Sequence, residues 1–201
     1  MFAERNGWAF IHPDFRGPYR RPEAAASDLV AQDILDAVEY AKQHANVDPS
    51  RIYLAGFSGG GMTALAMAGR RPDLWAGVAA WAPIHDLPDW YHYSARFPRR
   101  HYAHDISLAC GGAPKPGTAA FKECQSRSPS ALLDRARRAG VPVYIGCGLG
   151  DDTVPPEHAV RAYNQLANPS EQVPEATFRS IAKAALNLPQ ASTRAYARAG
   201  A

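Results

Sequence analysis

The chain has 201 residues, of which 46% are hydrophobic and 20% charged, a balance that suits one ordinary globular domain. A net charge of +3, spread over scattered Lys and Arg residues, argues against nucleic acid or a membrane surface as a partner. No apolar run is long enough to span a bilayer, and the first residues do not resemble a signal peptide, which slightly favours the cytoplasm.

The first half of the chain alternates between predicted helices and strands. Residues 1–6 have the character of the end of a helix. Apolar residues at helical spacing then predict a helix that begins at Ser27 or Asp28 and ends near His44. Short apolar and β-branched runs predict strands. In chain order these further elements are a strand at 8–12, a strand at 52–57, a helix at 62–70 and a strand at 77–82.

The second half continues this alternation after an interruption. Residues 84–128 are rich in aromatics, His, Arg, Gly and Pro, and we interpret them as an excursion over the strand ends that contains short helices. Predicted elements follow as a helix at 130–139, a fourth strand at 141–147, a helix at 157–166 and a helix at 175–186 within an Ala/Arg-rich tail, 167–201. Residues 196–201 show no strand signal. The alternation predicts one α/β domain over residues 1–201, with a doubly wound, mostly parallel sheet covered on both faces.

The strand at 52–57 leads directly into the sequence Gly56-Phe57-Ser58-Gly59-Gly60 and then into a helix. A strand, a sharp turn and a helix form the context that a nucleophilic serine needs. Gly56 and Gly60 are expected to remove side chains that would clash at the turn. The N–H of Gly59, at the start of the helix, is a candidate oxyanion donor. The alternative is a glycine-rich turn that carries a serine by chance.

Serine chemistry also needs a base and a carboxylate that orients the base. The loop after the fourth strand, Gly148–Pro155, supplies two carboxylates, Asp151 and Asp152. From position alone, a catalytic acid and a pair of turn-capping aspartates are equally open interpretations.

Several motifs together resemble the catalytic domain of the prolyl oligopeptidase family of serine peptidases. The resemblance extends over residues 7–166 and includes Trp8–His12 with Pro13–Gly17, a helix with Asp33 and Ala37, Asp48–Tyr53, Gly56–Gly60, Ser128-Pro129 and Gly148–Pro155. It implies the α/β-hydrolase fold, Ser58 as nucleophile and Asp151 as triad acid. Val154 matches a position that helps to line the primary specificity pocket in relatives. The implied substrate is a peptide or a small ester, without a cofactor.

The sequence departs from this family in two places. Relatives carry the triad histidine a few tens of residues after the acid, whereas the only histidine beyond Asp151 here is His158, seven residues on. His158 is therefore a candidate base, with a helix-cap or surface role as the alternative. Relatives also have a strand and a His-Gly-Gly-like loop before the equivalent of Trp8. We therefore expect a sheet that is incomplete at both ends and a native N-terminus that is missing, so that a larger parent chain or a homo-oligomer completes the fold.

These departures leave three functions open: a serine peptidase of low activity, a carboxylesterase, and a non-catalytic α/β module that binds a ligand or partner. Arg16, after the first predicted strand, either orients a substrate carbonyl or carboxylate or stabilises its own loop.

The cysteines and the remaining histidines give weaker signals. Cys110 and Cys124 bracket a Gly/Pro-rich loop and could form a disulfide, while Cys147 falls in a strand that we expect to be buried. His101 and His104 are near Asp105 but form no recognisable metal motif, so no metal site is predicted. The aromatic cluster between Trp90 and Tyr102 serves either loop packing or the shape of a substrate pocket.

Overall fold

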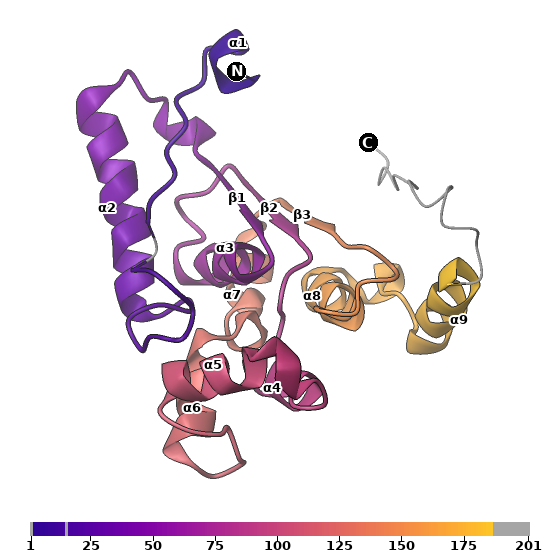
Figure 1. Ribbon diagram of the computed structural model, residues 1–201. Helices are drawn as coiled ribbons and strands as arrows, with labels where there is room; N and C mark the ends of the chain where they lie inside the picture. Colours follow the sequence, from indigo (N-terminus) through magenta and orange to yellow (C-terminus); the bar gives the residue numbers. More distant parts are fainter. Residues whose placement is uncertain (1, 15, 187–201) are drawn as a thin grey trace.

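A computed structural model describes residues 2–14 and 16–186. Its centre is a three-stranded parallel sheet in the order β1-β2-β3 (Figure 1). The strands are β1 (Tyr53–Phe57), β2 (Gly77–Trp81) and β3 (Val143–Gly146). The α/β class and the parallel pairing predicted from the sequence are therefore confirmed.

The helices occur at positions close to those predicted. They are α1 (Phe2–Arg5), α2 (Asp28–His44), α3 (Gly59–Arg70), α4 (Leu87–Ser94), α5 (Tyr102–Cys110), α6 (Ala119–Arg127), α7 (Leu133–Ala139), α8 (Glu157–Leu166) and α9 (Glu175–Leu186). Ser27 caps α2, since its Oγ accepts a hydrogen bond from the N–H of Val30 at 3.2 Å. Residues 196–201, for which no strand was predicted, lie outside the described residues. None of the helices in the described part of the chain is long and apolar enough to cross a membrane.

The strand predicted at Trp8–His12 is wrong. This segment is irregular and exposed, and the side chain of Phe10 is 72% accessible. An extended segment forms a strand only when a neighbouring strand pairs with it, and within residues 2–14 and 16–186 no strand is hydrogen-bonded to this segment. The Trp8 ring instead stacks on Tyr53 of β1, with ring centroids 6.2 Å apart. The sheet therefore has one strand fewer than predicted over these residues.

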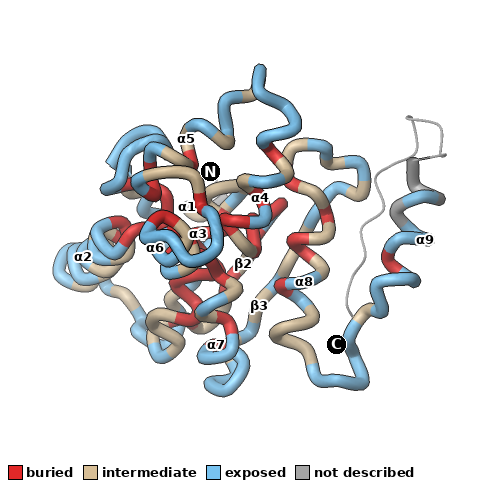
Figure 2. Tube along the Cα trace, turned by 90° about the horizontal axis from the view of Figure 1, so that it is seen from below, coloured by how far each residue is buried: buried red, intermediate tan, exposed pale blue. Residues whose placement is uncertain are grey.

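One face of the sheet is packed against helices. Leu54, Val78 and Ile145 alternate onto this face and contact the core that α2, α3 and α7 complete. Successive right-handed crossovers in one direction place the connecting helices on the same side of a sheet. The helix α3 is the centre of this core, because every residue from Gly61 to Gly69 is buried (Figure 2).

The opposite face of the sheet is exposed over the described residues, contrary to the expectation of cover on both faces. It carries aromatic side chains that alternate with the buried ones, namely Tyr53, Phe57, Trp81 and Tyr144. Trp81 and Tyr144 contact one another at a centroid distance of 5.1 Å. Cys147 is also exposed, contrary to prediction, because β3 ends one residue earlier.

The segment between β2 and α7 forms three helices that pack beside α3. Apolar side chains of α4, α5 and α6 meet Met62 of α3 in a second core. Cys110 at the end of α5 and Cys124 in α6 form a disulfide with a Cα–Cα distance of 5.5 Å, which lies within the usual range.

Candidate functional site

The turn between β1 and α3 holds Ser58 in an unusual backbone conformation. Its φ and ψ angles are 55° and −119°, a region that non-glycine residues rarely occupy. The N–H of Ser58 donates to the carbonyl of Trp81 at 2.8 Å, which anchors the turn to β2. Strained backbone that the surrounding structure holds in place is characteristic of functional sites.

Two glycines make this turn possible. A Cβ at Gly56 would lie 2.1 Å from the carbonyl oxygen of Gly60, and a Cβ at Gly61 would lie 2.8 Å from the carbonyl oxygen of Trp81. A Cβ at Gly60 would meet nothing within 4 Å, so the prediction that Gly60 avoids a clash is wrong. The required pair is Gly56 and Gly61, because the first turn of α3 lies directly against β1 and β2.

A cavity of about 260 Å³ opens beside Ser58. Its lining combines the β1–α3 turn with two residues from the N-terminal loop, Tyr19 and Ala25, and with residues of α4 and α5. Most of the lining groups are apolar or aromatic, among them Leu87, Trp90 and Ile106. Small-molecule sites commonly have this character. The aromatic cluster of the excursion thus shapes a pocket.

Tyr19 supports the turn from the N-terminal loop. Its phenol donates a hydrogen bond to the carbonyl of Gly59 and lies 2.9 Å from Oγ1 of Thr63. A Cβ at Gly59 would lie 2.6 Å from the Tyr19 ring, so a larger residue there would displace this ring. Burial raises the pKa of Tyr19 to about 12, which keeps the phenol neutral and able to donate. Sequence analysis missed Tyr19, because no local pattern places it near the turn.

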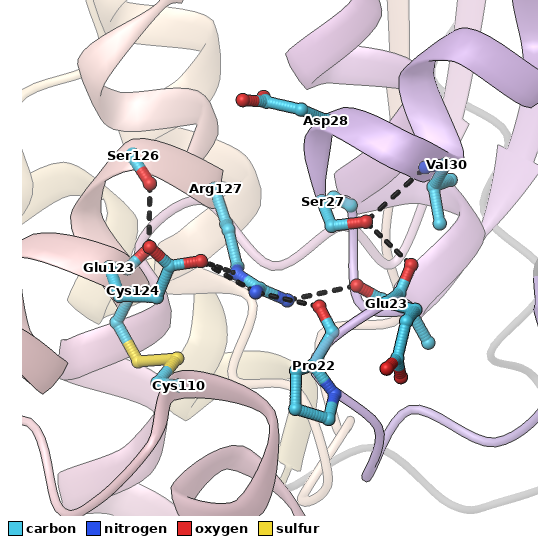
Figure 3. A network of polar contacts seen from close by, with 12 residues as sticks. Pro22, Glu23, Ser27, Asp28, Val30, Cys110, Glu123, Cys124, Ser126 and Arg127 are labelled. Carbon is cyan, nitrogen blue, oxygen red and sulfur yellow. Dashed lines mark hydrogen bonds and ion pairs between the residues drawn. A yellow bond between two sulfur atoms is a disulfide. The ribbon is translucent and has the colours of Figure 1, made fainter.

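A buried arginine fastens the loop that carries Tyr19 (Figure 3). The guanidinium of Arg127 in α6 donates to the carbonyls of Pro22 and Ala24 at 2.8 and 2.9 Å, and to the carboxylate of Glu123 at 2.6 Å. The Arg127 side chain is only 5% exposed. These bonds tie two carbonyls of the N-terminal loop to α6, so α6 fixes the N-terminal wall of the cavity.

The two aspartates after β3 have different contacts. Oδ1 of Asp151 accepts hydrogen bonds from the N–H groups of Thr153 and Val154 at 2.9 and 3.0 Å, so the turn-capping contact is present. Oδ2 of Asp151 has no partner among the described residues. Asp152 instead pairs with Arg100 at 2.8 Å, and this hydrogen bond lowers the pKa of Asp152. The carboxylate with a free acceptor oxygen is therefore that of Asp151.

His158 lies in a buried polar cluster and has neither a cap nor a surface role. It is 2% exposed, its Nδ1 accepts a hydrogen bond from the N–H of His85 at 3.3 Å, and its Nε2 is 3.9 Å from Asp89. Burial lowers the pKa of His158 to about 4. His158 is not among the residues that line the cavity beside Ser58.

The two remaining candidates also lie outside the cavity lining. Val154 is 3% exposed and packs behind the pocket wall, in the same cluster as Leu87 and Trp90. Arg16 forms a bidentate ion pair with Asp33 of α2, with both N–O distances at 2.6 Å. The hydrogen bond with Arg16 lowers the pKa of Asp33, and the contact matches the loop-stabilising interpretation of Arg16.

The sequence of this chain is similar to a family of known proteins and to several of their sequences. Residues 19–184 match the prolyl oligopeptidase family. An acylamino-acid-releasing enzyme of Arabidopsis thaliana is 31% identical over 112 residues, which cover 48% of this chain and 15% of that protein. An acetylxylan esterase of Coprinopsis cinerea is 45% identical over 49 residues, which cover 24% of this chain and 13% of that protein.

A solved structure shows the same fold. The acylaminoacyl peptidase of Pyrococcus horikoshii superposes with a TM-score of 0.55 at 18% identity, over 73% of this chain and 22% of that one. The fold is therefore that of the α/β-hydrolases. The chain spans between 13% and 17% of the length of the curated relatives that it matches. Because the family match extends over most of the chain, this protein belongs to the prolyl oligopeptidase family.

Proposed function

We propose that this protein is a serine hydrolase that cleaves peptide or ester bonds through an acyl-enzyme on Ser58. The observation that carries the proposal is the position of Ser58, at positive φ on the β1–α3 turn and in the lining of an apolar cavity. This arrangement presents a hydroxyl to a substrate carbonyl, as a nucleophile elbow does. Family membership supports the same reaction class.

The proposed reaction begins when Oγ of Ser58 attacks the substrate carbonyl carbon and gives its proton to a base. The N–H of Gly59 has no acceptor within α3, because it is one of the first donors of that helix, so it is free to donate to the developing oxyanion. Collapse of the tetrahedral intermediate expels the amine or alcohol, which takes up the proton. Water then hydrolyses the acyl-enzyme by the same route.

Asp151 is the proposed triad acid. Its Oδ1 is held by two backbone donors, which leaves Oδ2 available to orient a histidine. Within this sequence, His158 is the only histidine that follows Asp151, and its contacts are with His85 and Asp89. We therefore propose that the 201-residue chain by itself turns over substrate very slowly, because loss of the base removes most of the rate enhancement.

Labelling with a fluorophosphonate probe tests this proposal. The wild-type chain should label slowly at Ser58. Ser58→Ala should abolish labelling, and Ser126→Ala, at an exposed serine of α6, should leave it unchanged. Persistent labelling of Ser58→Ala would contradict the assignment of the nucleophile. Fast stoichiometric labelling of the wild type would contradict the proposal that the chain lacks a base. If this fast labelling were lost in His158→Gln, His158 would be identified as the base.

We propose that the bond cleaved is either a peptide or an ester bond, since one relative is named as an acylamino-acid-releasing enzyme and another as an esterase. Matched amide and ester substrates with the same acyl group separate the two by their rates of acyl-enzyme formation.

The buried contacts of His158 favour a second candidate, a non-catalytic module whose cavity binds a ligand. Ligand binding by a chain that never labels at Ser58 would support the second candidate.

A further inference from the structure

One charged side chain, that of Asp105 in α5, lines the cavity beside Ser58. It is half-buried, and within the described part of the chain its carboxylate accepts no hydrogen bond and forms no ion pair. A carboxylate that is partly removed from water and has no partner is unfavourable. The cavity therefore contains an anionic group without a counter-ion from the protein.

Two of the basic side chains near α5, those of Arg96 and Arg100, are engaged elsewhere. Arg100 pairs with Asp152 at 2.8 Å, and Arg96 lies over the ring of Tyr93 at 4.3 Å from its centroid. The position of Asp105 in the first turn of α5 stabilises a negative charge only modestly, through the helix dipole. The charge of Asp105 thus remains available to a group that enters the cavity.

Two aromatic rings line the same cavity as the Asp105 carboxylate. The rings of Trp90 and Tyr102 line the same cavity, with centroids 5.3 Å apart and planes tilted by 37°. The indole N–H of Trp90 donates to the carbonyl of Thr153 at 2.9 Å, which fixes the orientation of its ring. Aromatic faces attract ammonium and guanidinium groups, and a carboxylate adds a charge-assisted hydrogen bond. A cation with an apolar stem fits both features.

We propose that Asp105, with Trp90 and Tyr102, selects substrates that carry a cationic group next to the carbonyl attacked by Ser58. The cation is either a lysine or arginine side chain or a free α-amino group, since both present the same charge at the end of a short stem. This inference rests on the proposed function for its chemical step, whereas the binding preference belongs to the cavity alone.

The preference for a cation is tested without turnover by measuring the equilibrium binding of two ligands of the same shape, one cationic and one neutral. Fluorine NMR titration compares 4-fluorobenzylamine with 4-fluorobenzyl alcohol on the full chain. The wild type should bind the amine about tenfold more tightly than the alcohol. Asp105→Asn should lose that preference, and Asp105→Glu should keep most of it. Asp36→Asn, which removes the same charge from the exposed side of α2, should bind as the wild type does. Equal binding of the two ligands to the wild type, or a preference that survives in Asp105→Asn, would overturn the proposal.

Labelling rates of Ser58 then distinguish the two sources of the cation. Three diphenyl phosphonate probes are compared: acetyl-lysyl, free-amino norleucyl and acetyl-norleucyl. Faster labelling by the first identifies a side-chain cation, and faster labelling by the second identifies a free α-amine. Equal rates for all three would contradict the selection. If no phosphonate probe labels Ser58, the NMR titration alone decides the role of Asp105, and fluorophosphonate labelling of the wild type and Ser58→Ala decides the nucleophile separately.

Discussion

The phenol of Tyr19 donates a hydrogen bond to the carbonyl of Gly59, the residue whose N–H faces the proposed oxyanion. A side chain of the N-terminal loop, which itself lines the cavity, thus holds the first residue of α3. Thr63 Oγ1 also donates to this carbonyl, at 3.0 Å, so Tyr19 is one of two side-chain donors.

Tyr19→Phe should slow fluorophosphonate labelling of Ser58 several-fold and destabilise the fold by about 1 kcal/mol, the usual value of one hydrogen bond. The ring would still fill the space beside Gly59, so the loss isolates the hydroxyl. Labelling kinetics and urea unfolding measure the two effects. Tyr40→Phe, at an exposed tyrosine of α2, is the control. An unchanged labelling rate in Tyr19→Phe would show that the hydroxyl does not position Gly59.

Arg127→Met should destabilise the fold by about 2 kcal/mol, because the carbonyls of Pro22 and Ala24 lose the hydrogen bonds that Arg127 donates. Urea unfolding measures this change. Arg179→Met removes an arginine that is 73% exposed and should cost at most about 0.5 kcal/mol. Equal costs for the two variants would contradict the role of Arg127 as a buried anchor of the N-terminal loop.

Reduction of the Cys110–Cys124 disulfide should lower the free energy of unfolding by about 3 kcal/mol, the value expected for a closed loop of this length, whose cysteines are 14 residues apart. Cys124→Ser should behave like the reduced protein, and reductant should then have no further effect. Urea midpoints with and without reductant test this. Cys147→Ser, at the exposed free cysteine, should match the wild type.

The stability should fall at acid pH because of His158 and His85, whose pKa values burial lowers, that of His158 to about 4. Between about pH 6.5 and pH 4 the unfolded chain binds a proton at His158 that the folded chain does not. The free energy of unfolding therefore has its full value above this pH range. It decreases as the pH falls through the range, by up to about 3 kcal/mol for His158.

Urea unfolding between pH 4 and pH 8 measures this dependence. His158→Gln should flatten the decrease, whereas His104→Gln, at an exposed histidine of α5, should leave it unchanged. A pH profile that is the same in His158→Gln and the wild type would contradict the buried neutral state of His158.

Local patterns in the sequence were sufficient for most helices and for the serine turn. The spacing of apolar residues predicted α2 within a residue, and the bounds of α8 and α9 agree with the prediction. Gly56 and Ser58 were recognisable because a tight strand–helix turn tolerates few residue types. The prediction of a strand at Trp8–His12 was wrong because a strand needs a partner strand, and the sequence of the segment itself does not encode that partner.

The cavity, by contrast, was decided by tertiary structure. Tyr19, Trp90 and Asp105 are far apart in the sequence, and only the packing of the N-terminal loop, α4 and α5 around α3 brings them to one wall beside Ser58. The environment of His158 could not be predicted either, because its burial against His85 depends on where α8 meets the loop between β2 and α4. The sequence by itself determined the residue types that can form the turn and the helices, through local sterics and periodicity. Tertiary packing decided which charges are paired, buried or left free, because those properties depend on neighbours that are remote along the chain.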